Sequence, residues 1–396
     1  MTAADITAEK RGSSKALIFA MAVSAGMAAA NMYYNQPMLG IITAEFPDSA
    51  FTRAIPPATQ LGFAIGIFLL VPLGDLMDRR RLIVAQFAVL GLALASAALA
   101  PSAGVLVISS LLIGMCASAA QQIVPFAAAL ALEKNRGRTV GAVMAGLLCG
   151  LLLSRTLAGF VAAHFGWRAM FWLAVPMMWL TAIAMRAMLP KVAPLSTLKY
   201  GAALKSLGDI WRSEPTLRRA AMIQAVIFAL FSSFWAVLAL YLQSPAFNLG
   251  SDAAGLFGIV AAVGVMAAPI AGRLADRRGP QLVIWLGAAL TFLSWVLFGV
   301  WTHLAGLVIG VIILDFGVQS AMVSNQHVIY ATRPEARNRF NTIFMASIFV
   351  GGAIGSSAAV SAWDAWGWNG VTIGASAVGF LLLAVMTLTR KPYTKT

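Results

Sequence analysis

Long apolar stretches alternate with short polar clusters along the whole of this 396-residue chain. No charged residue occurs between Leu82 and Leu132. A helix needs about 20 mainly apolar residues to cross the hydrocarbon core of a bilayer, so each such stretch predicts a membrane-spanning helix. With charge clusters, Pro and Gly taken as boundaries, the pattern predicts twelve spans, at 16–44, 56–74, 82–101, 104–132, 139–163, 168–189, 219–243, 253–272, 281–301, 304–331, 339–361 and 369–389.

The composition agrees with an all-α membrane protein. The chain is 60% hydrophobic and 11% charged, whereas soluble domains average about 25% charged residues. A net charge of +14 would otherwise raise the question of nucleic acid. Here the basic residues recur in short clusters between apolar runs, so we expect no nucleic-acid partner.

The distribution of Lys and Arg predicts the topology. Cytoplasmic loops of membrane proteins carry an excess of these residues. With twelve spans and both termini cytoplasmic, all of the 28 Lys and Arg except Arg53, Arg155 and Arg168 fall on the cytoplasmic side. We therefore predict a six-helix bundle at 1–189, a cytoplasmic linker at 190–218 and a second six-helix bundle at 219–396. Residues 200–212 of the linker are expected to form an amphipathic surface helix.

An internal repeat relates the two halves. Asp75 and Asp276 lie 201 residues apart, as do Gly166-Trp167 and Gly367-Trp368. The same offset joins Arg136 to Arg337, Arg138 to Arg339, Gly150 to Gly351, and Tyr33-Tyr34 to Phe234-Trp235. Because six spans is an even number, both halves enter the membrane in the same orientation. Such pseudo-symmetric parallel bundles are typical of transporters whose halves rock about a site near the midplane.

Two motifs carry a resemblance to a known family. The segment Gly272–Gly279 reads GRLADRRG, and its first-half counterpart Val71–Arg81 reads VPLGDLMDRRR. With the six-plus-six repeat, these segments resemble the loop motif of the major facilitator superfamily, G-x-L-A-D-R-x-G-R. Asn31–Pro37 (NMYYNQP) and Thr59–Gly62 (TQLG) are similar to bacterial members of its drug:proton antiporter group. Ser154-Arg155 stands where that group has Gly-Pro in its fifth helix.

The resemblance implies a gate at the cytoplasmic face. Each motif aspartate is expected near the N-terminus of a helix in the other half, where the helix dipole favours an anion. Asp75 would then meet the start of the eleventh helix near Arg339, and Asp276 the start of the fifth near Arg138. The alternative is that these residues only set topology and cap helix ends. The gate prediction further includes Arg79, Arg80, Gly272, Arg277 and Gly279.

Two ionisable residues lie deep inside predicted spans, where charge is costly and commonly functional. Asp315 lies about 11 residues, or roughly 16 Å, from the outer end of the tenth span, and Arg155 about 8 residues, or roughly 12 Å, from the outer end of the fifth. The family places these helices on opposite halves. Our hypothesis is an Asp315–Arg155 pair that closes the outer side and breaks on protonation or substrate binding. A static pair, two residues facing a wet cavity, and coupling through His327 are the alternatives.

Polar and aromatic side chains of the first, fourth, seventh and tenth spans are the candidates for substrate binding, because the family's cavities are lined by these helices. The candidates are Asn31, Tyr33, Tyr34, Asn35, Gln36, Gln121, Gln122, Phe234, Trp235, Gln319 and Asn325. Any one of them can instead bond only between helices, since amides in lipid need partners. Aromatics and amides with few charges favour an uncharged or amphipathic organic solute.

The predicted function is secondary active transport by alternating access, as proton-coupled efflux of a small amphipathic or drug-like molecule. The alternative is a proton-coupled or facilitative transporter of a sugar or another small nutrient. The chain lacks H-E-x-x-H, G-x-S-x-G, a P-loop and a His/Cys cluster, so we predict no enzyme activity, no cofactor and no metal. Expected partners are a small-molecule substrate, protons and the lipid bilayer. We expect a monomer in the bacterial inner membrane.

Overall fold

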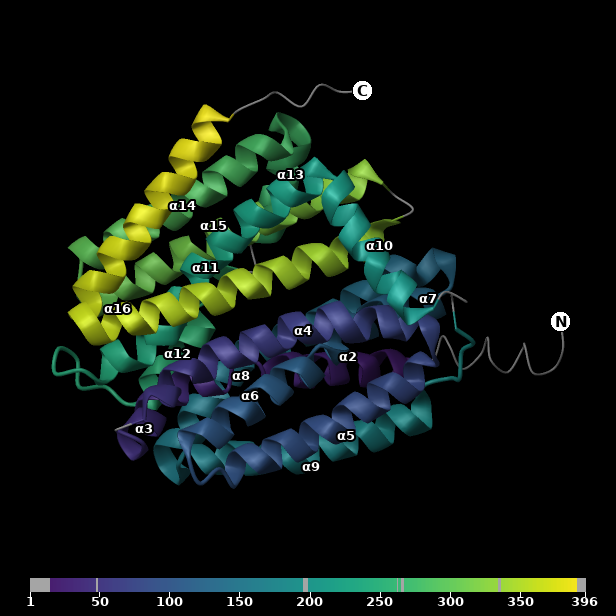
Figure 1. Cartoon of the computed structure of the whole chain (residues 1–396), viewed down its shortest axis with the longest axis horizontal. Coiled ribbons are helices and arrows are strands. Elements are labelled where there is room, and N and C mark those ends of the chain that lie inside the picture. The colour runs from purple at the N-terminus through teal and green to yellow at the C-terminus, as the bar shows by residue number, and fades with distance from the viewer. Residues whose placement is uncertain are drawn as a thin grey trace, which may run out of the picture. The chain divides into compact units, whose positions relative to one another are not determined.

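The structure is a computed structural model that describes residues 15–47, 49–194, 199–261, 263–264, 267–333 and 336–389 (Figure 1). Within these ranges the chain forms helices and no strand. The first part holds α2 (Lys15–Ala30), α3 (Asn35–Glu45), η1 (Ala50–Ala54), α4 (Ile55–Leu76), α5 (Arg79–Ala98), α6 (Ala103–Ala117), α7 (Ala119–Leu130), η2 (Glu133–Asn135), α8 (Arg136–Phe165) and α9 (Trp167–Met188). The rest holds α10 (Tyr200–Ser213), α11 (Pro215–Gln243), α12 (Ser251–Ala261), α13 (Ala267–Arg278), α14 (Pro280–Val300), α15 (Leu304–Thr332) and α16 (Arg337–Leu388).

The all-helical membrane fold is confirmed. In the described part of the chain, ten helices are long and apolar enough to cross a membrane. One of them, α16, covers both predicted spans 339–361 and 369–389, with non-helical φ/ψ at Gly367 between them. The predicted span 253–272 falls on α12 and α13, and residues 262, 265 and 266 between them lie outside the described residues. The count of twelve therefore stays a prediction, as do the positions of both termini, which lie outside the described residues.

Two compact units make up the structure. The first takes in the described residues up to Arg212 together with Leu242–Gly258, and the second takes in Ser213–Tyr241 and the described residues from Ile259 onward. The chain thus returns to the first unit for the beginning of α12. The bundle boundaries predicted at 189 and 219 stay predictions.

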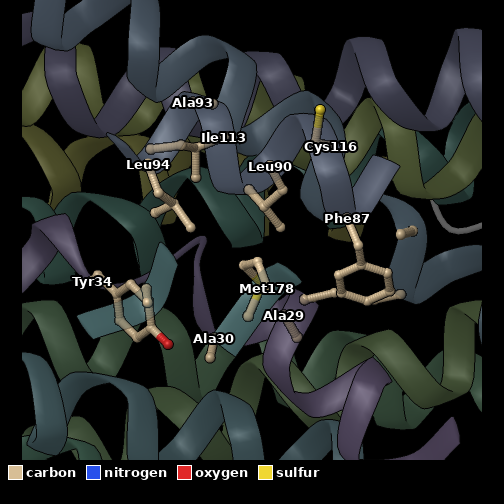
Figure 2. Packing of buried hydrophobic residues seen from close by; sticks show 14 of the residues in the cluster. Ala29, Ala30, Tyr34, Phe87, Leu90, Ala93, Leu94, Ile113, Cys116 and Met178 are labelled. Atoms are coloured by element: carbon tan, nitrogen blue, oxygen red, sulfur yellow. The ribbon is translucent and has the colours of Figure 1, made fainter. Parts of the chain in front are cut away.

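Helices of the first unit pack in three close pairs, α2 with α8, α4 with α6, and α5 with α9 (Figure 1). Buried side chains from four helices fill the space between them, among them Ala29, Leu90, Cys116 and Met178 (Figure 2). These side chains pack against one another as one buried cluster. In the second unit α14 packs on both α15 and α16, and α13 packs on α15.

The predicted repeat extends to backbone conformation. Gly166 has φ of 82° and Gly367 has φ of 63°, and each is followed by a buried tryptophan. L-residues with a side chain rarely adopt such angles, so glycine allows the chain to reverse between two antiparallel helices at both places. The two tryptophans anchor the turns, because Trp167 Nε1 donates to Glu45 Oε2 at 2.6 Å and Trp368 Nε1 donates to the carbonyl of Phe298 at 3.0 Å.

Both units contain a glycine–aromatic contact between helices, although only one residue of each pair is related by the 201-residue offset. In the first unit Gly91 of α5 lies under the indole of Trp179 of α9, where an added methyl group would overlap the ring. In the second unit Phe292 of α14, 201 residues after Gly91, lies against Gly379 of α16 at 3.3 Å from the position of an added methyl carbon. Each pair joins one glycine to one aromatic residue, with the glycine on opposite helices.

The predicted amphipathic helix at 200–212 is α10. Its Leu207 and Ile210 are buried, whereas Lys205 and Asp209 are exposed. Tyr200 Oη donates to the carbonyl of Leu69 at 3.0 Å, which ties the start of α10 to α4 of the first unit. Residues 195–198 of the predicted linker lie outside the described residues.

Candidate functional site

A buried arginine lies at the centre of the polar contacts of the first unit. Arg155 of α8 is 1% exposed. Burial strips a charged group of hydration at a cost of several kcal/mol, so protein groups must replace the water. Arg155 Nε donates to Gln36 Oε1 at 2.9 Å, and its Cζ lies 4.3 Å from the ring centroid of Tyr33. The structure thus brings together three residues that the sequence singled out.

Tyr33 and Gln36 reach Arg155 because the first predicted span is broken. Residues 31–34 form a turn between α2 and α3. There Met32 N donates to Ala29 O and Tyr33 N to Ala30 O, the tighter i to i−3 pattern. Pro37 follows two residues into α3 and cannot donate to a preceding carbonyl. The break in the first span therefore lies just before Pro37.

The backbone of Arg155 also lies in a tight crossing between α8 and the start of α12. Ser251 Oγ donates to Gly159 O at 3.0 Å, and Thr156 Oγ1 donates to Gly255 O at 2.9 Å. A methyl carbon added to Gly255 would lie 2.7 Å from Arg155 O. Small residues at a crossing allow membrane helices to approach closely, so α12 holds Arg155 from the backbone side.

The other amides of the first span bond within that span and to neighbouring helices of the first unit. Asn31 Nδ2 donates to Met27 O at 2.7 Å and contacts Met178 Sδ at 3.2 Å. Asn35 Nδ2 donates to Thr59 Oγ1 at 2.7 Å. The oxygens Asn31 Oδ1, Asn35 Oδ1 and Gln60 Oε1 are buried and accept no hydrogen bond from the part of the chain that the structure describes. Tyr34 is buried in the bundle core (Figure 2).

The two glutamines of the fourth span lie just after a helix break. α6 ends at Ala117, Ser118 lies between the helices, and α7 begins at Ala119. Gln122 Nε2 donates to Gln86 Oε1 at 2.6 Å, and Gln86 Nε2 donates to Ser118 Oγ at 3.2 Å. Gln121 is only partly buried. Gln122 therefore takes part in a network between helices, whereas nothing in these contacts assigns Gln121 a partner.

In the second unit, the amide candidates link α11 to α15. Asn325 Nδ2 donates to Gln224 Oε1 at 3.0 Å, and Gln224 Nε2 lies 3.4 Å from Val318 O. Gln319 is partly buried on the same helix. Asp315 is 6% exposed, and Gly264 packs against its Cβ. A carboxylate this deep in an apolar helix is the residue that the sequence predicted as the coupling group.

Phe234 and Trp235 belong to a buried aromatic cluster of the second unit. They are 0% and 2% exposed. Phe234 stacks on Phe298 with ring centroids 4.6 Å apart, and Trp235 meets Phe234 edge-on at 5.6 Å. Aromatic pairs in these geometries add stability beyond their buried area. The arrangement shows both residues packing within their own unit.

The first-half loop motif makes a local ion pair. Asp75 accepts from Arg79 four residues later, and Arg79 Nε also donates to Gly74 O at 3.1 Å. Asp78 caps α5 by accepting from the backbone N of Arg80 at 3.0 Å. Asp78, which was not among the predicted gate residues, thus caps a helix end, whereas the gate role of Asp75 stays a prediction.

The second-half motif closes α13. Gly279 follows the last residue of that helix with φ of 87°, and Gly272 is partly buried. Exposed charges of the motif and its expected partners are Asp276, Arg277, Arg138 and Arg339. The interlocking of Asp75 and Asp276 with the opposite halves stays a prediction.

Sequence reasoning missed a charged cluster that joins α3, α9 and the loop between α5 and α6 in the first unit. Glu45 at the end of α3 accepts from Arg168 and from Trp167 Nε1. Arg168 also donates to Ala100 O at 3.0 Å and lies 4.1 Å from the ring centroid of Trp167. The sequence feature that could have revealed this cluster is the position of Arg168, which follows the repeated Gly-Trp pair and lies outside the predicted cytoplasmic clusters of basic residues.

Long apolar helices that bury amides, an arginine and an aspartate define a multi-pass membrane protein whose polar groups lie inside the protein. Residues 21–332 match the family model of the Major Facilitator Superfamily. The chain belongs to this superfamily of transporters, which are not enzymes, and its predicted membership is confirmed.

Two relatives named as transporters align over most of this chain. The chain is 39% identical over 376 residues to the uncharacterized transporter YgaY of Escherichia coli, covering 94% of this chain and 95% of the relative. It is 32% identical over 360 residues to the transporter SCO4007 of Streptomyces coelicolor, covering 90% and 84%. A shorter match, 26% identical over 166 residues and 40% of this chain, is to the multidrug resistance protein MdtG of Klebsiella pneumoniae, 39% of which is covered.

Solved transporters share the fold. The nucleoside transporter NupG superimposes with a TM-score of 0.77 at 11% identity, covering 95% of this chain and 100% of that structure. A peptide transporter superimposes with a TM-score of 0.72 at 14% identity, covering 93% and 94%. At these identities the likeness shows the fold alone.

Proposed function

We propose that this protein exports a small amphipathic or drug-like organic molecule by alternating access, in exchange for protons, across the bacterial inner membrane. The observation that carries the proposal is the burial of two opposite charges within apolar helices of a transporter superfamily, Arg155 at 1% and Asp315 at 6% exposure. Ionisable groups at such positions in transporters mark substrate or proton pathways. The partial match to a multidrug resistance protein favours efflux.

The surroundings of Arg155 favour an amphipathic solute. Its neighbours include an amide and an aromatic ring. Buried amide oxygens of the first two spans, Asn31 Oδ1, Asn35 Oδ1 and Gln60 Oε1, accept no hydrogen bond from described residues. Buried acceptors are stabilised by a donor, which the hydroxyl, amine or amide of an organic molecule supplies. Aromatic side chains offer apolar and cation-binding faces to the remainder of such a molecule.

Asp315 is the proposed proton carrier, and Arg155 its proposed partner. In this scheme the pair keeps the outer side closed, and protonation of Asp315 or arrival of substrate releases it. Because proton and substrate compete for one carboxylate, they cross the membrane in opposite directions. The protein would act as a monomer, with each chain holding its own pathway.

Flux measurements in proteoliposomes test this proposal. Purified protein is given tetraphenylphosphonium, ethidium, glucose or uridine, with and without an imposed pH gradient. We expect gradient-driven movement of the amphipathic cations, and its loss in Asp315→Asn. Asp209→Asn, an exposed residue of α10, serves as the matched control and should transport normally. Sugar or nucleoside uptake in the wild type, or unchanged proton dependence in Asp315→Asn, would exclude the proposed coupling.

A further inference from the structure

Gln36 and Tyr33 contact a protein charge, which suggests a role other than binding substrate directly. We infer that Gln36 is a positioning residue, which fixes the orientation of the Arg155 guanidinium and links it to the break in the first span. The inference rests on the proposed function, because it gives Arg155 a part in transport. It replaces direct substrate contact by Gln36 with action through Arg155.

The geometry restrains the guanidinium from two sides. The hydrogen bond from Nε to Gln36 Oε1, at 2.9 Å, sets the rotation about the bond that leads to the guanidinium plane. The ring of Tyr33, 4.3 Å from Cζ, limits movement of that plane. An arginine has five N–H donors in a rigid fork, and Gln36 takes only the one at Nε. The terminal nitrogens Nη1 and Nη2 are therefore the atoms whose direction Gln36 and Tyr33 determine.

Burial makes this restraint effective. Gln36 is 3% exposed and Tyr33 is 6% exposed, so water does not compete strongly for the guanidinium on this side. A hydrogen bond to a charged group is stronger than one between neutral groups, and more so in a medium of low dielectric constant.

The anchor lies on a part of the first span that is not continuous helix. Tyr33 is within the turn at residues 31–34, and Gln36 is the second residue of α3. Because α2 and α3 meet at this turn, a change in their angle would shift both side chains relative to α8. The orientation of Arg155 is thereby coupled to the shape of the first span.

Transport kinetics distinguish positioning from substrate contact. Gln36→Met keeps the length of the side chain but removes the acceptor, and Gln36→Glu keeps an acceptor at the same reach. We expect Gln36→Met to lower kcat for tetraphenylphosphonium about tenfold, the scale of one hydrogen bond to a charged group, with KM nearly unchanged. Gln36→Glu should restore much of kcat. A raised KM at unchanged kcat would show direct substrate contact and overturn the inference.

Thermal unfolding in detergent gives a readout that does not depend on transport. Gln36→Met should lower Tm in the wild-type background but not in Arg155→Met, because the lost contact is already absent there. Gln86→Leu, a buried amide that bonds Gln122 and Ser118 instead, should lower Tm equally in both backgrounds. If Gln36→Met also lowers Tm equally in the wild-type and Arg155→Met backgrounds, the inference is wrong. If the wild-type protein transports none of the test compounds, but the Tm effect of Gln36→Met still depends on Arg155, the proposed efflux function is wrong and the contact between Gln36 and Arg155 is retained.

Discussion

Replacing Gly159 with alanine perturbs the crossing of α8 and α12 that holds the backbone of Arg155. The new methyl carbon would lie 3.0 Å from Gly255 Cα and 3.1 Å from its nitrogen, and closer still to Ser251 O. All three atoms belong to the backbone, so no side-chain rotation relieves the overlap. α12 must move away by several tenths of an ångström or more to restore ordinary contact.

The expected cost follows from the contacts that this movement weakens. Two hydrogen bonds cross the interface, from Ser251 Oγ to Gly159 O and from Thr156 Oγ1 to Gly255 O. Such bonds contribute about 0.6 kcal/mol each in membrane proteins, and overpacking a tight site typically costs about 1–3 kcal/mol. Alanine regains up to about 1 kcal/mol through its higher helix propensity. The net expected loss is about 1–3 kcal/mol.

A matched substitution on the same helix isolates the contact. Gly141 of α8 has no atom within 4 Å of an added methyl carbon, so Gly141→Ala gains the same helix propensity without overlap. Thermal unfolding in detergent should show a Tm a few degrees lower for Gly159→Ala and an equal or higher Tm for Gly141→Ala. Equal Tm values for the two variants would refute the tight crossing.

Three further predictions concern contacts elsewhere in the chain. Glu45→Gln should lower Tm by an amount that shrinks in high salt, because its partner Arg168 is partly exposed and salt screens such pairs; a salt-independent loss would contradict this. Gly367→Ala should cost about 1–3 kcal/mol, since residues with a side chain rarely adopt φ of 63° with ψ of −156°; unchanged thermal unfolding would contradict this. Gln86→Leu should destabilise by about 1–3 kcal/mol, because Gln122 loses a buried partner; adding Gln122→Leu should recover part of the loss, measured by Tm.

Much of the fold could be predicted because membrane spans are set by local composition. Spans such as 82–101 and 281–301 fall on single helices, α5 and α14, since apolar length alone determines them. Breaks inside spans were harder to predict from the sequence. The first span breaks close to Pro37, but the fourth span breaks at Ser118 with no Pro or Gly beside it. There the hydroxyl of Ser118 donates to Met115 O and accepts from Gln86 Nε2. The contact with Gln86 depends on tertiary packing, so the sequence alone does not reveal it.

The candidate site was predictable by residue type but not by partner. Arg155 was a candidate because charged residues are rare in apolar helices. Gln36 was a candidate because amides in lipid need hydrogen-bond partners. Their mutual contact spans 119 positions of sequence, and no local pattern encodes it. Similarly, Gln122 was a reasonable candidate for the cavity, yet its hydrogen bonds go to Gln86 and Leu70. The periodic pattern of residues along a helix does not show which neighbouring helix each face contacts.

The glycine–aromatic contacts of the two units limit how residues can be exchanged between them. Gly91 lies against Trp179, whereas its counterpart Phe292 lies against Gly379. The counterpart of Trp179 at the 201-residue offset is Phe380, one position after Gly379. Gly91→Phe would therefore place a second ring against Trp179. The two interfaces are filled by different sets of residues, so a single residue transplanted from one unit to the other would not conserve the packing.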